Sequence, residues 1–154
     1  EAPLLGNMYI GKVKNVVRNI QAAFVEVEGG IPCYLPLSEK VQPYYTNKTN
    51  CAHLAVGDEL LVQIAREGVK TKAPTLTMNI SFPGKYLVLT SGKTQTGVST
   101  KIAKRERERL QGLAGTLPKG AFGWIIRTNA AEASEEEICR EARVLAERFD
   151  NVCR

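Results

Sequence analysis

The sequence predicts two small domains: a five-stranded β-barrel of the OB-fold type over residues 1–80, and a mixed α+β domain over residues 81–154. In the first half, five short segments are rich in β-branched and aromatic residues, and one long connection separates the third from the fourth. This spacing is the OB-fold pattern. In the second half, segments with strand patterns alternate with segments of helical periodicity, which indicates an α+β domain.

The first three strands are predicted at residues 8–17, 22–27 and 31–35. A turn at residues 18–20 follows the first of them, and Glu28-Gly29-Gly30 closes a hairpin between the second and the third. The connection over residues 40–57 is long and polar, and a loop of this length is usually functional or mobile. Strands at residues 60–65 and 75–80, joined by a turn that carries Lys70 and Lys72, complete the predicted barrel.

Phe82-Pro83-Gly84 interrupts the strand pattern, and the second domain is predicted to be strand, helix, strand, helix. The strands are expected at residues 85–90 and 121–127, with a Gly, Ser and Thr loop at residues 91–100. A helix over residues 104–113 should bury Leu110, Leu113 and Leu117 and stop near Gly115. Ser134 and Glu137 form a capping box that opens a second helix. Its inner face is predicted to be Ile138, Ala142, Leu145 and Phe149.

Aromatic and basic residues on the first strands are candidates for contact with RNA. Phe24 and Tyr34 lie on neighbouring strands of the predicted hairpin, and Lys12, Lys14 and Arg18 flank them. Aromatic rings on a curved sheet beside cations can stack single-stranded bases and hold the phosphates. Aromatics on strands are also often core residues, and Phe24 could point inward, so the sequence leaves these two alternatives about even.

The net charge of +5 is compatible with a polyanionic partner but does not demand one. Residues 1–80 carry eight Lys or Arg against seven acids, whereas residues 81–154 carry thirteen against nine. The surplus lies mainly in residues 101–109, where both signs alternate. Such a mixture is more typical of a solvated helix face than of an RNA track.

The sharpest local constellation is Ile126-Arg127-Thr128-Asn129, at the end of a predicted buried strand. A guanidinium fork and a hydroxyl aimed at one point suit a terminal phosphate. Gly84 and the loop up to Thr100 could add backbone N–H groups to the same anion. The alternative is a structural Arg127 that pairs with an acid on the last helix, and the spacing alone favours this alternative.

The sequence contains no complete catalytic or metal site. The four cysteines include no C-x-x-C pair, so a structural zinc site is not expected. Cys51 and the single histidine, His53, are two residues apart, but a loop thiol beside a loop imidazole is a better interpretation than a metal site. The only aspartates, Asp58 and Asp150, are far apart, so clustered carboxylates for two-metal hydrolysis are missing. No apolar run approaches the 18 or more residues of a membrane span, so no membrane partner is expected. Free thiols fit a reducing, cytoplasmic setting.

Six phrases in a fixed order resemble the ribonuclease E/G family. Three of them, YIGKVKNV, AAFVEV and YLPL, lie within residues 6–39, GNMYIGKVKNVVRNIQAAFVEVEGGIPCYLPLSE. This stretch is similar to the family's OB-fold RNA-binding domain, the type named after ribosomal protein S-one. The phrases PGKYLVLT, GVST and GWIIRTNA, at residues 83–90, 97–100 and 123–130, resemble the family's 5′-sensor domain. The resemblance covers nearly the whole chain.

The resemblance implies roles for individual residues. Arg127 and Thr128 match the pair that grips the 5′-monophosphate of an RNA substrate, and Gly84 and Val88 match positions whose backbone helps to hold that end. Lys101 falls where the family places basic residues, although Thr100 stands where a second one is expected. The positions that match the RNA-contacting residues of the barrel are Phe24, Tyr34 and Lys72, to which the residue pattern adds Lys12.

The resemblance also implies what this chain lacks. The family cleaves RNA with a metal-dependent domain whose aspartates, together with a zinc link used for oligomerisation, have no counterpart in this sequence. We therefore expect the substrate-recognition part of an endoribonuclease, which needs no cofactor of its own, whereas the parent enzyme uses Mg²⁺ and is a homo-oligomer. Because Glu1 follows no methionine, we expect a piece of a longer protein. The alternative function is a stand-alone RNA-binding OB-fold protein linked to translation.

Overall fold

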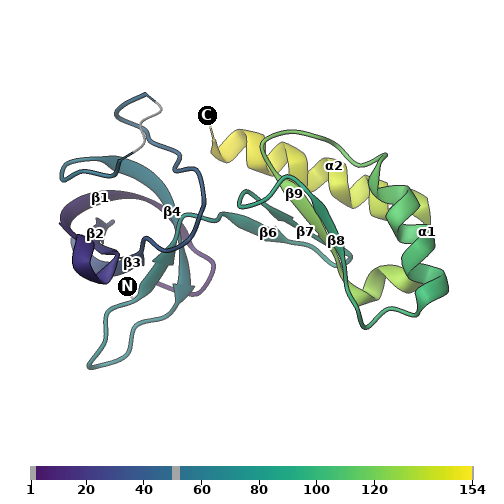
Figure 1. Ribbon diagram of the computed structural model, residues 1–154, viewed down its shortest axis with the longest axis horizontal. Helices are drawn as coiled ribbons and strands as arrows, with labels where there is room; N and C mark the ends of the chain where they lie inside the picture. Colours follow the sequence, from purple (N-terminus) through teal and green to yellow (C-terminus); the bar gives the residue numbers. More distant parts are fainter. Residues whose placement is uncertain (1–2, 50–52, 154) are drawn as a thin grey trace. The chain divides into compact units, whose positions relative to one another are not determined.

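The computed structural model describes residues 3–49 and 53–153, so the predicted loop thiol Cys51 lies outside the described residues. The chain forms two compact units, residues 1–80 and 81–154. Each unit has its own sheet and its own buried core, and each is described by itself below (Figure 1).

The first unit is a closed five-stranded barrel, as the sequence predicts, and its strand order is β1-β2-β3-β5-β4. Its strands are β1 (Met8–Val17), β2 (Ala22–Val27), β3 (Ile31–Pro36), β4 (Glu59–Arg66) and β5 (Thr75–Thr77). A short 3₁₀-helix, η1 (Arg18–Ile20), replaces the simple turn expected there. All neighbouring strands are antiparallel except β3 and β5, whose parallel pairing closes the barrel at Tyr34 and Thr75.

Strand β5 ends three residues earlier than predicted. The Thr77 hydroxyl accepts a hydrogen bond from the backbone N–H of Asn79, at 3.0 Å, and lies 2.9 Å from a carboxylate oxygen of Glu39. A side-chain bond of this kind competes with the strand ladder, so the strand pairing of β5 ends here.

Alternation along the strands decides which side chains fill the barrel. On β2, Ala23, Val25 and Val27 are buried, whereas Phe24 between them faces out. Gly11 on β1 is required for packing, because a Cβ atom there would come within 2.5 Å of a Val25 methyl carbon. The inward faces of the strands meet in one apolar cluster that includes Val13, Cys33, Leu35, Leu60, Val62, Ile64 and Leu76.

The described residues of the long connection between β3 and β4 are tied to the barrel by hydrogen bonds. The Asn47 side chain donates to the Gly57 carbonyl at 3.0 Å and accepts from the Glu59 backbone N–H at 2.9 Å. Lys48 forms an ion pair with the nearly buried Asp58, at 2.6 Å. These bonds hold both arms of the loop against the start of β4.

The second unit is a four-stranded sheet with two helices, in the strand order β6-β7-β9-β8. The α+β class is confirmed, but the order strand, helix, strand, helix is wrong because two strands were not predicted. The elements are β6 (Ser81–Pro83), β7 (Leu87–Thr90), β8 (Thr96–Val98), α1 (Lys104–Ala114), β9 (Gly123–Ile126), η2 (Thr128–Glu132) and α2 (Glu135–Val152).

The two missed strands each have only three residues, too few for a period-2 pattern to be visible. Strand β6 contains the Phe82-Pro83 pair, which the sequence predicts to interrupt the strand pattern. The strand lies at the edge of the sheet, where proline is tolerated. Strand β8 lies inside the predicted loop and pairs in parallel with β9. Pairing across the sheet, rather than local propensity, makes both segments strands.

Helix α2 follows the sequence prediction closely. Ser134 accepts a hydrogen bond from the Glu137 backbone N–H, and Glu137 accepts from the Ser134 N–H, which completes the capping box. The Ser134 N–H, the Ser134 hydroxyl and the Tyr86 hydroxyl all donate to the Glu137 carboxylate, and these bonds hold the pKa of that carboxyl below its usual value. The predicted inner face, Ile138, Ala142, Leu145 and Phe149, is buried. Helix α1 likewise buries Leu110 and Leu113, and Leu117 beyond it is buried too.

Candidate nucleic-acid interface

A hollow of about 340 Å³ lies at the end of β9 and brings several of the predicted phosphate-binding residues together. Of the five predicted residues, Val88, Lys101, Arg127 and Thr128 line it, and Gly84 does not. The hollow is also lined by Ser99, from the predicted Gly, Ser and Thr loop, and by Ile126 and Asn129, from the predicted constellation. Ile125 lines it as well, and the sequence does not predict this residue.

Backbone hydrogen bonds at the end of β9 fix the position of the residues that line the hollow. The Arg127 N–H donates to the Tyr86 carbonyl at 2.8 Å, and the Arg127 carbonyl accepts from the Ala130 N–H at 2.9 Å, where η2 begins. On the other side, the Ser99 N–H donates to the Ile126 carbonyl at 3.0 Å. The strand thus ends between two other segments, which places the side chains of residues 127–129 beside Ser99.

Hydrogen-bond donors of several kinds line the hollow. The Arg127 Nη1 donates to the Gly84 carbonyl at 2.6 Å, which uses one of the five guanidinium N–H groups. The Thr128 and Ser99 hydroxyls are 3.2 Å apart, and the Lys101 backbone N–H donates to the Ser99 Oγ at 3.3 Å. Arg127, Thr128 and Lys101 are all exposed. Two cations beside two hydroxyls form a setting suited to a small anion.

The alternative role for Arg127, a direct ion pair with an acid of the last helix, is not observed. In the described part of the chain, the ion pairs are Lys48 with Asp58 and Arg109 with Glu106. The guanidinium of Arg127 instead binds a backbone carbonyl.

Gly84 contributes differently from the sequence expectation. Its N–H donates to the Leu87 carbonyl at 2.7 Å, so this N–H is already used within the turn. Its carbonyl oxygen accepts the Arg127 bond instead. In this structure the Gly84 N–H is engaged within the turn, and its carbonyl faces Arg127. From the predicted Gly, Ser and Thr loop, Ser99 lines the hollow.

The floor of the hollow is apolar. Val88 on β7 and Ile125 on β9 are opposite each other in the sheet, and Ile125 is 46% exposed. Their neighbours along the strands, Leu87 and Ile126, are buried on the helical side. A flat apolar surface beside a cationic corner can accommodate a ring next to a phosphate. Sequence reasoning missed Ile125 because a strand of near-continuous apolar residues does not show which face is covered.

On the barrel, Phe24 and Tyr34 lie directly opposite each other on β2 and β3. Their ring centroids are 6.0 Å apart in an edge-to-face arrangement, and Phe24 is 37% exposed. The structure thus decides the alternative that the sequence left open, since Phe24 faces out and is not a core residue. The register of the hairpin places both rings on the outer face.

The two lysines predicted at the barrel site lie in different surroundings. Lys12 is exposed on β1, but its register partners on β2 and β4 are Glu26 and Glu59, which offset its charge locally. Lys72 is exposed in the turn before β5, two residues from Pro74, whose carbonyl accepts the Tyr34 N–H at 2.9 Å. This bond ties the end of the Lys72 turn to the strand that carries Tyr34.

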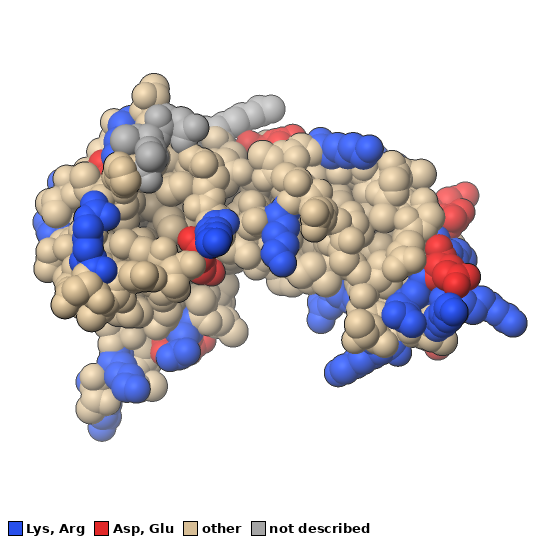
Figure 2. All heavy atoms as spheres, viewed as in Figure 1, with Lys and Arg blue, Asp and Glu red and all other residues tan. Residues whose placement is uncertain are grey.

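Figure 2 shows Lys and Arg side chains spread over the visible surface of both units, with acidic side chains among them. In this view no continuous basic stripe is present. Individual cations at a defined site, rather than a general basic surface, therefore distinguish the hollow at Arg127.

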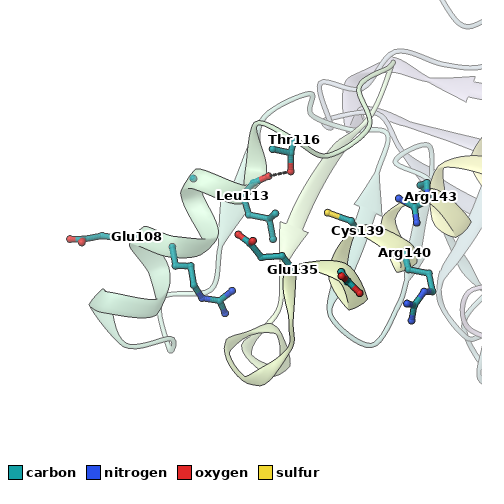
Figure 3. A pocket seen from close by; sticks show the side chains of 10 residues that line it. Glu108, Leu113, Thr116, Glu135, Cys139, Arg140 and Arg143 are labelled. Carbon is teal, nitrogen blue, oxygen red and sulfur yellow. Dashed lines mark hydrogen bonds between the residues drawn. The ribbon is translucent and has the colours of Figure 1, made fainter.

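A second and larger cleft, of about 680 Å³, lies between α1 and α2 (Figure 3). Leu113 and Thr116 line it near the end of α1, and Cys139 and Arg143 line it from α2. Both acidic and basic side chains line it, and it contains none of the residues predicted for binding.

Within the described ranges, no group of three His, Cys, Asp or Glu residues is placed to hold a metal ion. Across the same residues, the model contains no helix with the length and apolar character needed to cross a bilayer. Cys33, Cys139 and Cys153 are unbridged, and burial raises the pKa of the Cys33 thiol.

A closed OB-type barrel followed by a small α+β unit with a cationic hollow is the class of protein that the structure defines. The model of the "Ribonuclease E/G family" matches residues 81–154. Ribonucleases G of Salmonella typhimurium and Escherichia coli are each 31% identical to this chain over 153 residues, which is 92% of the chain. Ribonuclease E of Nostoc sp. is 33% identical over 155 residues, which is 96% of the chain.

The chain contains a ribonuclease E/G family region at residues 81–154, and both of its units are similar to ribonucleases G and E. It spans 31% of the length of the two ribonucleases G and 22% of that of the Nostoc ribonuclease E. The similarity extends over both units of the chain, since it covers more than nine tenths of the sequence.

Proposed function

We propose that this chain recognises single-stranded RNA and its 5′-monophosphate end for an endoribonuclease that processes and degrades RNA. The observation that carries the proposal is the hollow at the end of β9, where Val88, Lys101, Arg127 and Thr128 converge. Arg127 retains N–H donors beyond the one bound to Gly84, and Thr128 adds a hydroxyl. A phosphate monoester accepts such donors with its three terminal oxygens.

The apolar floor supports the same proposal. A nucleotide whose 5′-phosphate binds at Arg127 would place its ribose and base next to Val88 and Ile125, which line the same hollow. Aliphatic side chains on a flat sheet can pack against a base without selecting its identity. A 5′-triphosphate is larger and does not fit the same guanidinium fork, so we expect it to bind this site less well.

In the first unit, Phe24 and Tyr34 supply the surface for the RNA strand. Both rings lie on the outer face of β2 and β3, where OB-folds bind oligonucleotides. Base stacking on aromatic rings tolerates any sequence, because every base has a π-face. Lys12 and Lys72, both exposed, complete the proposed contacts as phosphate partners.

RNA cleavage, on this proposal, takes place in another part of a longer protein. The described residues offer no cluster of carboxylates for metal-assisted hydrolysis. We propose that the whole protein is a Mg²⁺-dependent, homo-oligomeric hydrolase that acts in the cytoplasm, and that this chain contributes substrate recognition without a cofactor. The three unbridged cysteines support a reducing compartment.

The substitution Arg127→Ala tests the sensor. Short single-stranded RNAs with 5′-monophosphate, 5′-hydroxyl and 5′-triphosphate ends are titrated against both proteins. The unmodified chain should prefer the monophosphate, and the variant should lose roughly tenfold in affinity for that end alone, because hydrogen bonds to a charged group contribute about 1.5–3 kcal/mol. Affinity for the 5′-hydroxyl RNA should stay unchanged.

Arg148→Ala is the matched control, since Arg148 is an exposed arginine of α2 that lies outside the hollow. It removes the same charge, so it corrects for long-range electrostatics. Equal affinity of the unmodified chain for all three ends would rule out the sensor, and RNA cleavage by this chain in Mg²⁺ would refute the assignment of catalysis to another region.

The substitution Phe24→Ala tests the barrel surface. Binding of a 5′-hydroxyl RNA should weaken by about 1–3 kcal/mol if the ring stacks on a base. Because Phe24 is partly exposed, the free energy of unfolding should change little. The measurement is fluorescence anisotropy with labelled RNA, and Ile20→Ala is the control, because Ile20 is also exposed but lies in η1. RNA affinity that survives the loss of the Phe24 ring would exclude a stacking role.

A further inference from the structure

A carboxylate on α2 holds the turn that contacts Arg127. Glu141 accepts three consecutive backbone N–H groups: its Oε1 accepts from Lys85 at 2.6 Å, and its Oε2 accepts from Tyr86 at 2.8 Å and Leu87 at 2.9 Å. Gly84 fits against this carboxylate, because a Cβ atom there would lie 2.6 Å from the Glu141 Oε1. Gly84, which has no side chain, therefore leaves room for the Glu141 carboxylate.

The carbonyl groups of the same turn point to the hollow. The Gly84 carbonyl accepts from the Arg127 Nη1 at 2.6 Å, and the Lys85 carbonyl accepts from the Asn129 Nδ2 at 3.3 Å. The Tyr86 carbonyl accepts from the Arg127 backbone N–H at 2.8 Å. Each of these carbonyls shares a peptide plane with one N–H that binds Glu141. Three successive peptide planes thus connect Glu141 to residues 127–129.

We propose that Glu141 is a positioning residue for the recognition of the 5′-phosphate. The negative charge of Glu141 holds the turn at residues 84–87 in one position. The turn then orients the Arg127 guanidinium and the Asn129 amide at the hollow. This inference rests on the function proposed for Arg127. Glu141 touches no substrate, since it acts through the peptide planes between it and the hollow.

Hydrogen bonding through a peptide plane gives this arrangement its physical basis. A carboxylate that accepts the Lys85 N–H polarises the peptide and makes the Gly84 carbonyl a stronger acceptor for the guanidinium. The positive Arg127 and the negative Glu141 are thereby paired through one peptide instead of by direct contact. Such an indirect pair stabilises the side chain of Arg127 and leaves its other N–H groups available to a phosphate.

The substitution Glu141→Gln provides the first test. The glutamine side chain has one acceptor oxygen and an NH₂ group, which is a donor and opposes a backbone N–H. The ratio of the affinities for 5′-monophosphate and 5′-hydroxyl RNA should fall about fivefold, because a charge-assisted bond is lost. Affinity for the 5′-hydroxyl RNA should not change. Glu147→Gln, at an exposed position of the same helix, should leave the ratio unaltered.

A double substitution separates positioning from general damage. In an Arg127→Ala background, Glu141→Gln should produce no further fall in the ratio, because the group that it positions is gone. An unchanged ratio in a folded Glu141→Gln protein would overturn the inference, as would an effect of the same size without Arg127. If Arg127→Ala itself leaves the ratio unchanged, the proposed sensor function fails instead.

Nuclear magnetic resonance of the unmodified chain tests the proposal even if Glu141→Gln does not fold. Titration with adenosine 5′-monophosphate should shift the amide resonances of Lys85, Tyr86 and Leu87, which face away from the hollow, whereas adenosine should not shift them. Amide resonances that stay fixed while the Arg127 side-chain resonances move would overturn the connection through the turn.

Discussion

Replacing Phe149 by alanine is expected to lower the free energy of unfolding of the second unit by about 3–5 kcal/mol. Phe149 is 4% exposed and packs edge to face against Phe82 and Phe122, with ring centroids 6.3 Å and 5.3 Å away. Phe122 in turn contacts Trp124. Removal of the ring leaves a cavity where α2 covers the sheet, and a rigid aromatic cluster can fill it only in part.

Urea unfolding followed by tryptophan fluorescence measures this effect, because the single tryptophan, Trp124, lies in the second unit. Val144→Ala on the same helix is the control, since Val144 is 47% exposed and its truncation should change the free energy of unfolding little. A Phe149→Ala protein with the unfolding midpoint of the unmodified chain would show that the aromatic cluster does not stabilise this unit.

Replacing Gly123 by alanine is expected to destabilise the second unit by about 3 kcal/mol. A Cβ atom at this position would clash with the backbone carbonyl oxygens of Lys93 and Gln95, which belong to the segment that enters β8. Backbone atoms cannot rotate away as a side chain can, so β8 must shift from β9. Since β8 leads to Ser99, the wall of the hollow shifts too, and the preference for 5′-monophosphate RNA should fall.

Gly97→Ala is the matched control, because a Cβ atom at Gly97 meets nothing within 4 Å and its φ does not require glycine. Both variants add one methyl group to the same pair of strands. Unfolding by urea and the RNA affinity ratio are measured for each. Equal stability of the two variants would contradict the close approach at Gly123.

The sequence by itself determined the barrel and the two helices. Alternation over residues 22–27 and the Gly29-Gly30 turn specify the hairpin, and the inner face of α2 follows from helical periodicity and the Ser134 capping box. Each of these features depends on residues close together in the chain, so local pattern is enough. The position of Arg127 and Thr128 directly after the last strand could also be predicted, from the end of an apolar run.

The tertiary structure alone decided which residues meet around Arg127. Strands β6 and β8 exist because they pair with longer strands, and their three-residue sequences carry no periodic signal. The outward orientation of Phe24 required the register of the closed barrel. Glu141 is separated from the turn at Gly84 by more than 50 residues, so only folding brings its carboxylate to that backbone. Contacts that distant in sequence depend on packing, which no local pattern encodes.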